Sequence, residues 1–391
     1  MKTAKSNPER RKMLLLSFLL FVANKVFILI PAFYVHRGSF ENLTILSRIK
    51  LLLFENFSKW DSGWYIKIAE GGYNLKATAF FPLYPMSIRL VSFFTNDPLI
   101  SGIIISNVCF FFLIYFFMKL VRLDFTLKES CKITLLLIFF PTSYYFSAIY
   151  TESLYMLFFI LFLYYLRIEK WGIAALFGML AGGTRNTGVL LAIPFAIEYL
   201  SKHYRTHNGL FLNKQFWGIL KGAFIPVIAF LYMGFLWLKF GDPFAFSGVQ
   251  KEFGRGFMAP WDTLINGYQY HSLSFKKLLS GKFIYLDLYH IIELYFVTLL
   301  LVTTILSFRK IRFSYWIIIF YSILIPLTAP AYENVKDYFV SLSRYALVIV
   351  PLYFGLYEVF KRRFLFISLL TSFIALLILL VYFWSKSLWV A

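Results

Sequence analysis

Runs of about twenty apolar residues recur along this chain, and they constrain its fold more than any other feature. A helix needs about 20 apolar residues to cross the hydrocarbon core of a bilayer. With 60% hydrophobic and only 15% charged residues, the chain is far more apolar than a typical soluble domain. The sequence therefore predicts an all-α, polytopic membrane protein, and residues 1–391 are expected to form a single domain.

About eleven membrane-spanning helices are predicted from these runs, several of them short. They fall near residues 13–35, 98–118, 128–147, 152–167, 171–184, 186–200, 216–238, 288–307, 313–330, 344–360 and 364–384. Lys and Arg gather in the connecting segments on the same side as the basic N-terminus. Such clusters mark cytoplasmic loops, so the N-terminus is expected inside. They also explain the net charge of +20, and no nucleic-acid partner is expected.

The outer side is then expected to carry two long loops, residues 36–97 and 239–287. Long ordered loops often carry function. Within the first loop, Ser62 to Ala69 is expected to form a short helix. Pro82 to Phe94 is expected to form an amphipathic helix at the membrane interface.

A few ionisable residues lie in or beside the apolar runs, where charge is costly and usually functional. Lys25 lies within the first run, Glu152 begins the run at 152–167, and Arg344 begins the run at 344–360. Arg185 lies in a glycine-rich break, and Asp61 lies between two tryptophans of the first outer loop. On the predicted topology, all of these except Lys25 reach the outer side.

Each of these residues also has a purely structural interpretation. Asp61 is suited to cap the helix that follows it, because Asp is a good N-cap. Glu152 is suited to a structural ion pair with Lys25 or with an arginine. Arg344 can simply extend its head group to the interface. Arg185 is different, since a guanidinium beside the exposed backbone donors of a glycine-rich break suits a phosphate.

The sequence lacks the motifs of nucleotide-using enzymes. It contains no phosphate-binding loop, no dinucleotide-binding glycine motif and no Asp-x-Asp pair. His203 and His207 have the spacing of metal ligands on a helix, but no Glu accompanies them, so a solvated helix end is expected. We therefore expect no cofactor and no metal site; a divalent ion is compatible with membrane sugar transfer but is not supported by these residues.

Short segments in consecutive order resemble the PIG-V family of mannosyltransferases. They are WDSGWY at 60–65, IAEGGY at 68–73, FFPLYP at 80–85, SAIYTES at 147–153, TRNTG at 184–188, Gly-Asp-Pro at 241–243 and SRY at 343–345. The resemblance implies a GT-C-type helical bundle whose active site lies at the outer or lumenal face. Eukaryotic relatives add mannose to the glycosylphosphatidylinositol precursor from dolichyl-phosphate-mannose, and the family also has prokaryotic members.

The resemblance and the residues together suggest an inverting hexosyltransferase. Its partners would be a polyprenyl-phosphate-sugar donor, a lipid-linked or glycan acceptor and membrane lipids. It would lie in the cytoplasmic membrane of a prokaryote, or in the endoplasmic reticulum of a eukaryote. Two alternatives remain open at this stage: a GT-C enzyme with another sugar or acceptor, and a membrane transporter of a lipid or sugar.

Individual roles can be assigned to the candidate residues. Asp61 is the expected catalytic base, since an ordinary aspartate has a pKa near 3.9 and is ionised at neutral pH. The phosphate of the donor is expected to contact Arg185, Arg344 and Lys25. The acceptor or the sugar is expected to contact Trp60, Trp64, Tyr65, Glu152 and Asp242.

Overall fold

The computed structural model describes residues 7–41, 43–206, 217–332 and 337–390, and these are mostly helical. The first half of the chain forms α1 (Asn7–His36), α2 (Ile45–Leu53), α3 (Ser62–Gly71), α4 (Leu83–Thr95), α5 (Pro98–Val121), α6 (Leu127–Ile138), α7 (Glu152–Arg167), α8 (Trp171–Thr184) and α9 (Ala192–Thr206). The second half forms α11 (Val227–Phe240), α12 (Ala245–Gly248), α13 (Pro260–Leu279), α14 (Tyr285–Ser307), α15 (Phe313–Leu327), α16 (Leu342–Leu347), α17 (Leu352–Phe360) and α18 (Arg363–Ser385).

Short 3₁₀ helices connect several of these elements. They are η1 (Arg37–Phe40), η2 (Glu55–Phe57), η3 (Lys76–Ala79), η4 (Ser143–Phe146), η5 (Asn186–Leu191), η6 (Leu220–Phe224) and η7 (Val249–Phe253). No strand forms among the described residues, where only two isolated β-bridges join Ala331 to Arg255 and to Asp337. The predicted all-α class is confirmed.

Four helices of the described residues are long and apolar enough to cross a membrane: α1 with its continuation to Phe40, α5, α14 and α18. Residues Trp217–Phe224 and α11 form a fifth candidate, bent by 44° at its break. The apolar helices α8 and α15 are shorter. The figure of about eleven spans thus stays a prediction, because several predicted spans are not single long helices.

The segment between α6 and α7 explains part of the difference between the predicted spans and the observed long helices. The predicted span 128–147 ends as an α-helix at Ile138, and the chain then runs through turns and η4 to Glu152. Every residue from Phe139 to Thr151 is buried. Irregular backbone is tolerated at membrane depth only where protein covers it. Apolar composition alone does not distinguish such a buried turn from a helix.

Local sequence explains the helix boundaries in the outer loop and beyond. The side chain of Asp97 accepts hydrogen bonds from the backbone N–H groups of Leu99 and Ile100, and Pro98 follows it at the first turn of α5. At α6, Thr126 and Glu129 form a capping box. The predicted helices at 62–69 and 82–94 are present as α3 and α4.

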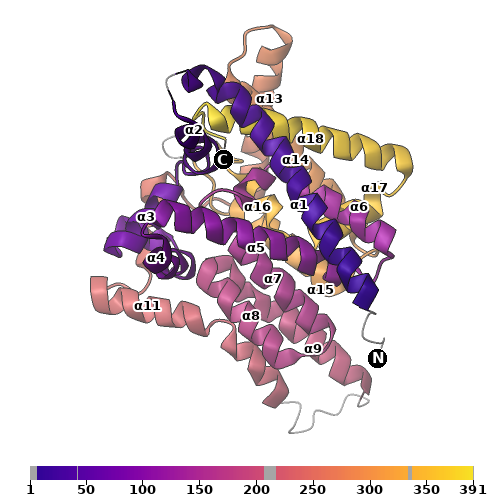
Figure 1. Cartoon of the computed structure of the whole chain (residues 1–391). Helices are drawn as coiled ribbons and strands as arrows, with labels where there is room; N and C mark the ends of the chain where they lie inside the picture. Colours follow the sequence, from indigo (N-terminus) through magenta and orange to yellow (C-terminus); the bar gives the residue numbers. More distant parts are fainter. Residues whose placement is uncertain (1–6, 42, 207–216, 333–336, 391) are drawn as a thin grey trace.

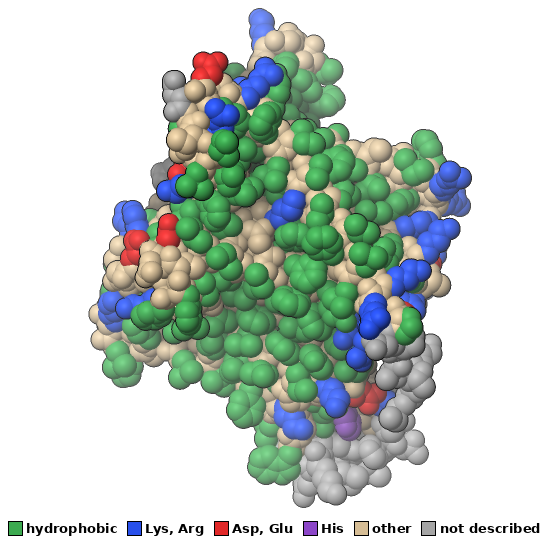
Figure 2. Space-filling model, viewed as in Figure 1, with side chains coloured by type: hydrophobic (Ala, Val, Ile, Leu, Met, Phe, Trp, Pro, Cys, Tyr) green, Lys and Arg blue, Asp and Glu red, His purple; other side chains and the backbone are tan. Residues whose placement is uncertain are grey.

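Most helices pack around one large core rich in Phe and Tyr. A smaller, separate cluster includes Phe81 and Tyr232. In Figure 1, α7 and α8 run side by side beneath α5, while α1 and α18 cross above them. Figure 2 shows hydrophobic side chains over most of this face, with most Lys and Arg side chains toward its edges. Exposed apolar residues of α1 and α5 include Leu15, Ile30 and Phe112. A surface of this kind suits lipid rather than water.

Ion pairs gather at the end of the bundle that includes the N-terminus of α1. They join the end of α5 to α1, the end of α7 to the turn after α5, and the start of α15 to α9. The pairs are Arg122–Glu9 at 2.9 Å, Arg167–Asp124 at 2.6 Å and Arg312–Glu198 at 2.8 Å. Arg122, Arg167 and Arg312, which lie in segments predicted on the inner side, therefore share one end of the molecule.

Candidate active site

Asp61 lies where an unusual turn enters α3. The preceding residue, Trp60, has φ 55°, in the left-handed region that residues with a side chain rarely adopt. Asp61 occupies the N-cap position of α3, but its side chain makes no capping hydrogen bond. Its Oδ2 instead accepts a hydrogen bond of 2.9 Å from Nη1 of Arg344. The interpretation of Asp61 as a simple helix cap is therefore wrong.

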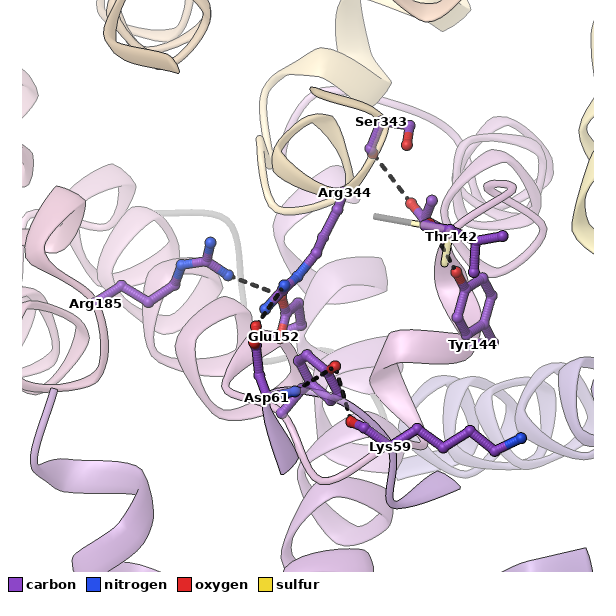
Figure 3. Close-up of polar contacts among 10 residues, drawn as sticks. Lys59, Asp61, Thr142, Tyr144, Glu152, Arg185, Ser343 and Arg344 are labelled. Atoms are coloured by element: carbon purple, nitrogen blue, oxygen red, sulfur yellow. Dashed lines mark hydrogen bonds and ion pairs between the residues drawn. The ribbon is translucent and has the colours of Figure 1, made fainter. Parts of the chain in front are cut away.

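Tyr150 fixes the turn that carries Asp61. Its hydroxyl donates to the carbonyl oxygen of Lys59 at 3.0 Å and accepts from the backbone N–H of Asp61 at 3.2 Å (Figure 3). The ammonium group of Lys59 extends away from the site and donates to the carbonyl oxygens of Trp384 and Ser385 at the end of α18. Burial lowers the pKa of Lys59 to about 8. Two distant parts of the chain thus hold the turn in place.

Glu152 joins two arginines at the first residue of α7. Its side chain is fully buried, and Oε1 accepts from Nε of Arg344 at 2.7 Å and from Nη1 of Arg185 at 3.0 Å (Figure 3). Its Oε2 has no hydrogen-bond partner among the described residues. Of the two ion pairs considered from the sequence, the structure contains the one with arginine. Lys25 instead donates to the side chains of Asn107 and Ser147.

Arg344 is directed into the protein. Its guanidinium bridges Asp61 and Glu152 and lies over the rings of Tyr145 and Tyr150, at 4.9 and 4.5 Å from their centroids. Only 10% of its side chain is exposed. The alternative in which Arg344 only extends to the interface is wrong. Two of its N–H groups already donate to carboxylates, which favours a role in positioning Asp61 and Glu152.

A second left-handed residue lies next to this bridge. Ser341 has φ 62°, and its backbone N–H donates to the hydroxyl of Tyr289 at 3.2 Å. Ser343 then donates through its backbone N–H, at 2.9 Å, and its hydroxyl to the carboxyl group of Glu293. Backbone strain of this kind persists where surrounding contacts over-determine it, and it clusters at functional sites.

Arg185 lies at the break predicted between residues 171–184 and 186–200. Helix α8 ends at Thr184, and Arg185 has an extended backbone with φ −146° and ψ 142°. A Cβ at Gly188 would lie 2.4 Å from the backbone of Ala181, so only glycine allows this close approach. The chain therefore leaves the axis of α8 at Arg185, and the guanidinium lies 5.7 Å from the ring centroids of Tyr155 and Tyr345.

These residues face a cavity of about 420 Å³. Its wall includes Asp61, Tyr65, Arg185, Arg344 and Tyr345, together with Arg255, Phe80 and Trp389. With Glu152 behind the wall, three guanidinium groups and two carboxylates leave an excess of one positive charge. A cavity of this size and polarity suits a small polar ligand that carries negative charge.

Arg255 was not identified from the sequence. Its Nη1 donates to the carbonyl oxygen of Ala329 at 3.1 Å, and its guanidinium lies 5.6 Å from the ring centroid of Tyr345. Arg185 and Arg255 thus both lie against Tyr345 in the wall of the cavity. A signal was available, since an arginine between Gly254 and Gly256 in an outer loop is placed on exposed, turn-forming backbone.

The remaining predicted residues are distributed less tightly. Tyr65 lines the cavity, and burial together with the nearby carboxylates raises its pKa above the usual value, so its hydroxyl is a donor there. Trp60 contacts the wall residue Trp389 edge to face, at 5.2 Å between centroids, and Trp64 stacks on the wall residue Phe80. Asp242 accepts from the backbone N–H of Phe244 in a local turn.

The structure therefore brings together Asp61, Tyr65, Glu152, Arg185 and Arg344. Trp60 and Trp64 lie behind the wall of the cavity, and Lys25 and Asp242 lie outside it. No described residue arrangement at the cavity resembles a metal site, because both of its carboxylates already accept hydrogen bonds from arginine. The one group of three potential ligands among the described residues lies elsewhere, at His271, His290 and Asp337.

The fold and the cavity define an integral membrane protein with a charged, partly enclosed site formed by the ends of several helices. The family model described as mannosyltransferase (PIG-V) matches residues 15–263, well over half of the 391 residues. The chain therefore belongs to the PIG-V mannosyltransferase family, and this membership implies a glycosyltransferase that transfers mannose. The comparison with curated proteins gave no match.

Proposed function

We propose that this protein is an inverting mannosyltransferase that uses a polyprenyl-phosphate-mannose donor and a lipid-linked or glycan acceptor. The observation that carries the proposal is the cavity in which the Asp61 carboxylate, held by Arg344, lies with the guanidinium groups of Arg185 and Arg255. Transfer from a prenyl phosphate needs a base for the acceptor, positive charge for the leaving phosphate and a place for the lipid.

The base is assigned to Asp61. The acceptor hydroxyl attacks the anomeric carbon, its proton passes to the Asp61 carboxylate, and a new glycosidic C–O bond forms. The bond between that carbon and the phosphate oxygen breaks, and polyprenyl phosphate leaves with the electron pair. Attack from the face opposite the phosphate inverts the anomeric centre, so a β-linked donor gives an α-linked product.

The leaving phosphate is assigned to Arg185 and Arg255. Arg344 has two N–H groups on carboxylates, whereas Arg185 spends one on Glu152 and Arg255 spends one on a backbone carbonyl. The guanidinium donors that remain match the oxygens of a phosphate. Negative charge that develops on the leaving group is thus met by fixed positive charge, which is a large term in enzyme catalysis.

An apolar groove supports the choice of a prenyl donor. A second cavity, of about 310 Å³, shares Phe81, Asn186, Thr187, Phe246 and Ile325 with the charged one. Its other walls are Val189, Leu190, Pro226, Ala229, Phe230 and Met233. A lipid whose phosphate lies at Arg185 would enter this groove directly, and the groove opens onto exposed apolar residues of α11.

The proposal places the cavity at the extracytoplasmic or lumenal face. Glu152 and Arg167 lie at opposite ends of α7, and Arg167 belongs to the end where basic residues gather. If that end is cytoplasmic, as positive charge favours, the cavity opens outside. The membrane would be the cytoplasmic membrane of a prokaryote, or the endoplasmic reticulum of a eukaryote.

The choice of sugar is tested with membranes from cells that make the protein and from cells that lack it. Both are incubated with radiolabelled polyprenyl-phosphate-mannose and, separately, with the glucose analogue. Label is expected in a lipid or glycan product only with the mannose donor and only when the protein is present. Label from the glucose donor alone would contradict the assignment of mannose.

A further inference from the structure

Three potential metal ligands from distant parts of the sequence meet in the protein interior. His271 lies in α13, His290 in α14, and Asp337 in the segment that leads to α16. All three are buried, and one ligand atom of each lies within 4.8 Å of the others. We propose that these residues bind a zinc ion, which fastens the segment carrying Arg344 to the α13–α14 pair.

The ligand types and their spacing favour zinc. Imidazole nitrogen and carboxylate oxygen are common zinc ligands, and two ligand atoms of a tetrahedral site are about 3.4 Å apart when each bond is about 2.1 Å. Nε2 of His271 lies 3.4 Å from Oδ1 of Asp337. Neither ring nitrogen of His271 has a hydrogen-bond partner among the described residues. Two ligand atoms thus face each other at a metal-like distance without a hydrogen bond between them.

The surroundings of His290 favour one tautomer of its ring. Asp287 accepts a hydrogen bond of 2.9 Å from the hydroxyl of Ser274, and the same hydroxyl lies 3.2 Å from Nδ1 of His290. Because the one proton of Ser274 goes to Asp287, Nδ1 of His290 is the donor in the second contact. This tautomer leaves the lone pair of His290 on Nε2, the nitrogen that the proposal assigns to the metal. Asp287 thus acts on His290 through the hydroxyl of Ser274, and an outer hydrogen bond that orients a ligating histidine through its other nitrogen is typical of zinc sites.

The site is structural, because none of the three ligands lines the charged cavity. Asp337 begins the described segment that reaches Ser341, whose left-handed backbone is held by Tyr289 of α14, and then Arg344. A zinc ion would add a bond between this segment and both helices of the pair. It would thereby hold Arg344 where it contacts Asp61 and Glu152, and a water molecule can complete the coordination.

Zinc content tests the proposal without any reference to sugar transfer. The full-length protein is purified in detergent without chelators, equilibrated with zinc, dialysed, and measured by elemental mass spectrometry. About one zinc per chain is expected for the wild type and for the control His36→Gln, which changes a histidine outside the cluster. The zinc content of His271→Gln and of Asp337→Asn is expected to be lower than that of the wild type by about tenfold or more.

Thermal unfolding of the wild-type protein gives a second measurement, which remains informative even if the ligand variants fold poorly. Treatment of the wild type with a chelator should lower its melting temperature, and added zinc should restore it. The melting temperature of His271→Gln should respond to neither. Equal zinc in the wild type and His271→Gln, or no zinc in the wild type after equilibration, would overturn the proposal and leave a His–Asp ion pair as the role of the cluster.

Discussion

Replacement of Asp61 by asparagine removes the negative charge of the carboxylate and leaves the size of the side chain and the other contacts of its turn nearly unchanged. The side chain makes no capping bond, so none is lost, and an amide oxygen can still accept from Nη1 of Arg344. Arg344 also keeps its 2.7 Å contact with Glu152. We therefore expect unfolding to become easier by only about 1 kcal/mol.

The expected loss in transfer is much larger. A general base typically contributes about 10²–10⁴-fold to rate, which corresponds to about 3–5 kcal/mol of barrier. Asp61→Asn should therefore express normally, bind the donor and lose transfer by about that factor. Because the substitution leaves Arg185 and Arg255 intact, the loss should appear in kcat, with little change in the concentration of donor needed for half-maximal rate.

The assay follows label from polyprenyl-phosphate-mannose into product with purified protein in proteoliposomes. The matched control is Asp97→Asn, which changes a true N-cap at the start of α5 that lies outside the cavity. Asparagine caps about as well as aspartate, so this control should transfer normally. Near-normal transfer by Asp61→Asn would refute the assignment, and Glu152 or Glu70 would become the next residues to test as the base.

Three further predictions concern the arginines, their shared carboxylate and the sidedness of the protein. Arg185→Lys keeps the charge but loses the planar fork, so turnover should fall strongly while the protein stays in the membrane; unchanged donor binding and rate would make Arg185 structural. Glu152→Gln removes the charge shared by two arginines in a buried position, and a loss of about 3 kcal/mol in stability is expected as a lower melting temperature; unchanged melting would contradict this network. In a background without the two native cysteines, Gly71→Cys, at an exposed position with open space, should react with an impermeant reagent from outside. Lys310→Cys should react only after permeabilisation, and the reverse pattern would contradict the orientation.

Much of the charged site was predictable because charge is rare in this chain. Asp61, Glu152, Arg185 and Arg344 are conspicuous in apolar surroundings, and the cost of burying isolated charges favours a shared site. Their partners were not predictable. The N-cap position of Asp61 follows from local sequence, but the choice between capping α3 and contacting Arg344 depends on residues nearly three hundred positions away.

The boundaries of α7 and α8 agree with the predicted runs 152–167 and 171–184, because basic residues and glycines end them. The run 344–360 is divided into α16 and α17, with Pro351 at the start of α17. Hydropathy does not report such breaks, since buried turns and buried helices are equally apolar. Asp337 and His271 are separated by more than sixty residues, so only tertiary packing brings them together.

The most direct test of the central claim compares two mannose donors with the purified wild-type protein in proteoliposomes that contain a membrane-lipid extract as acceptor. One sample receives radiolabelled polyprenyl-phosphate-mannose, and the other receives the same label as a nucleotide-linked mannose. We predict labelled product from the prenyl donor, with an α-linked mannose when the donor is β-linked, and none from the nucleotide donor. Product from the nucleotide donor alone, or a β-linked product from the β-linked prenyl donor, would contradict the account.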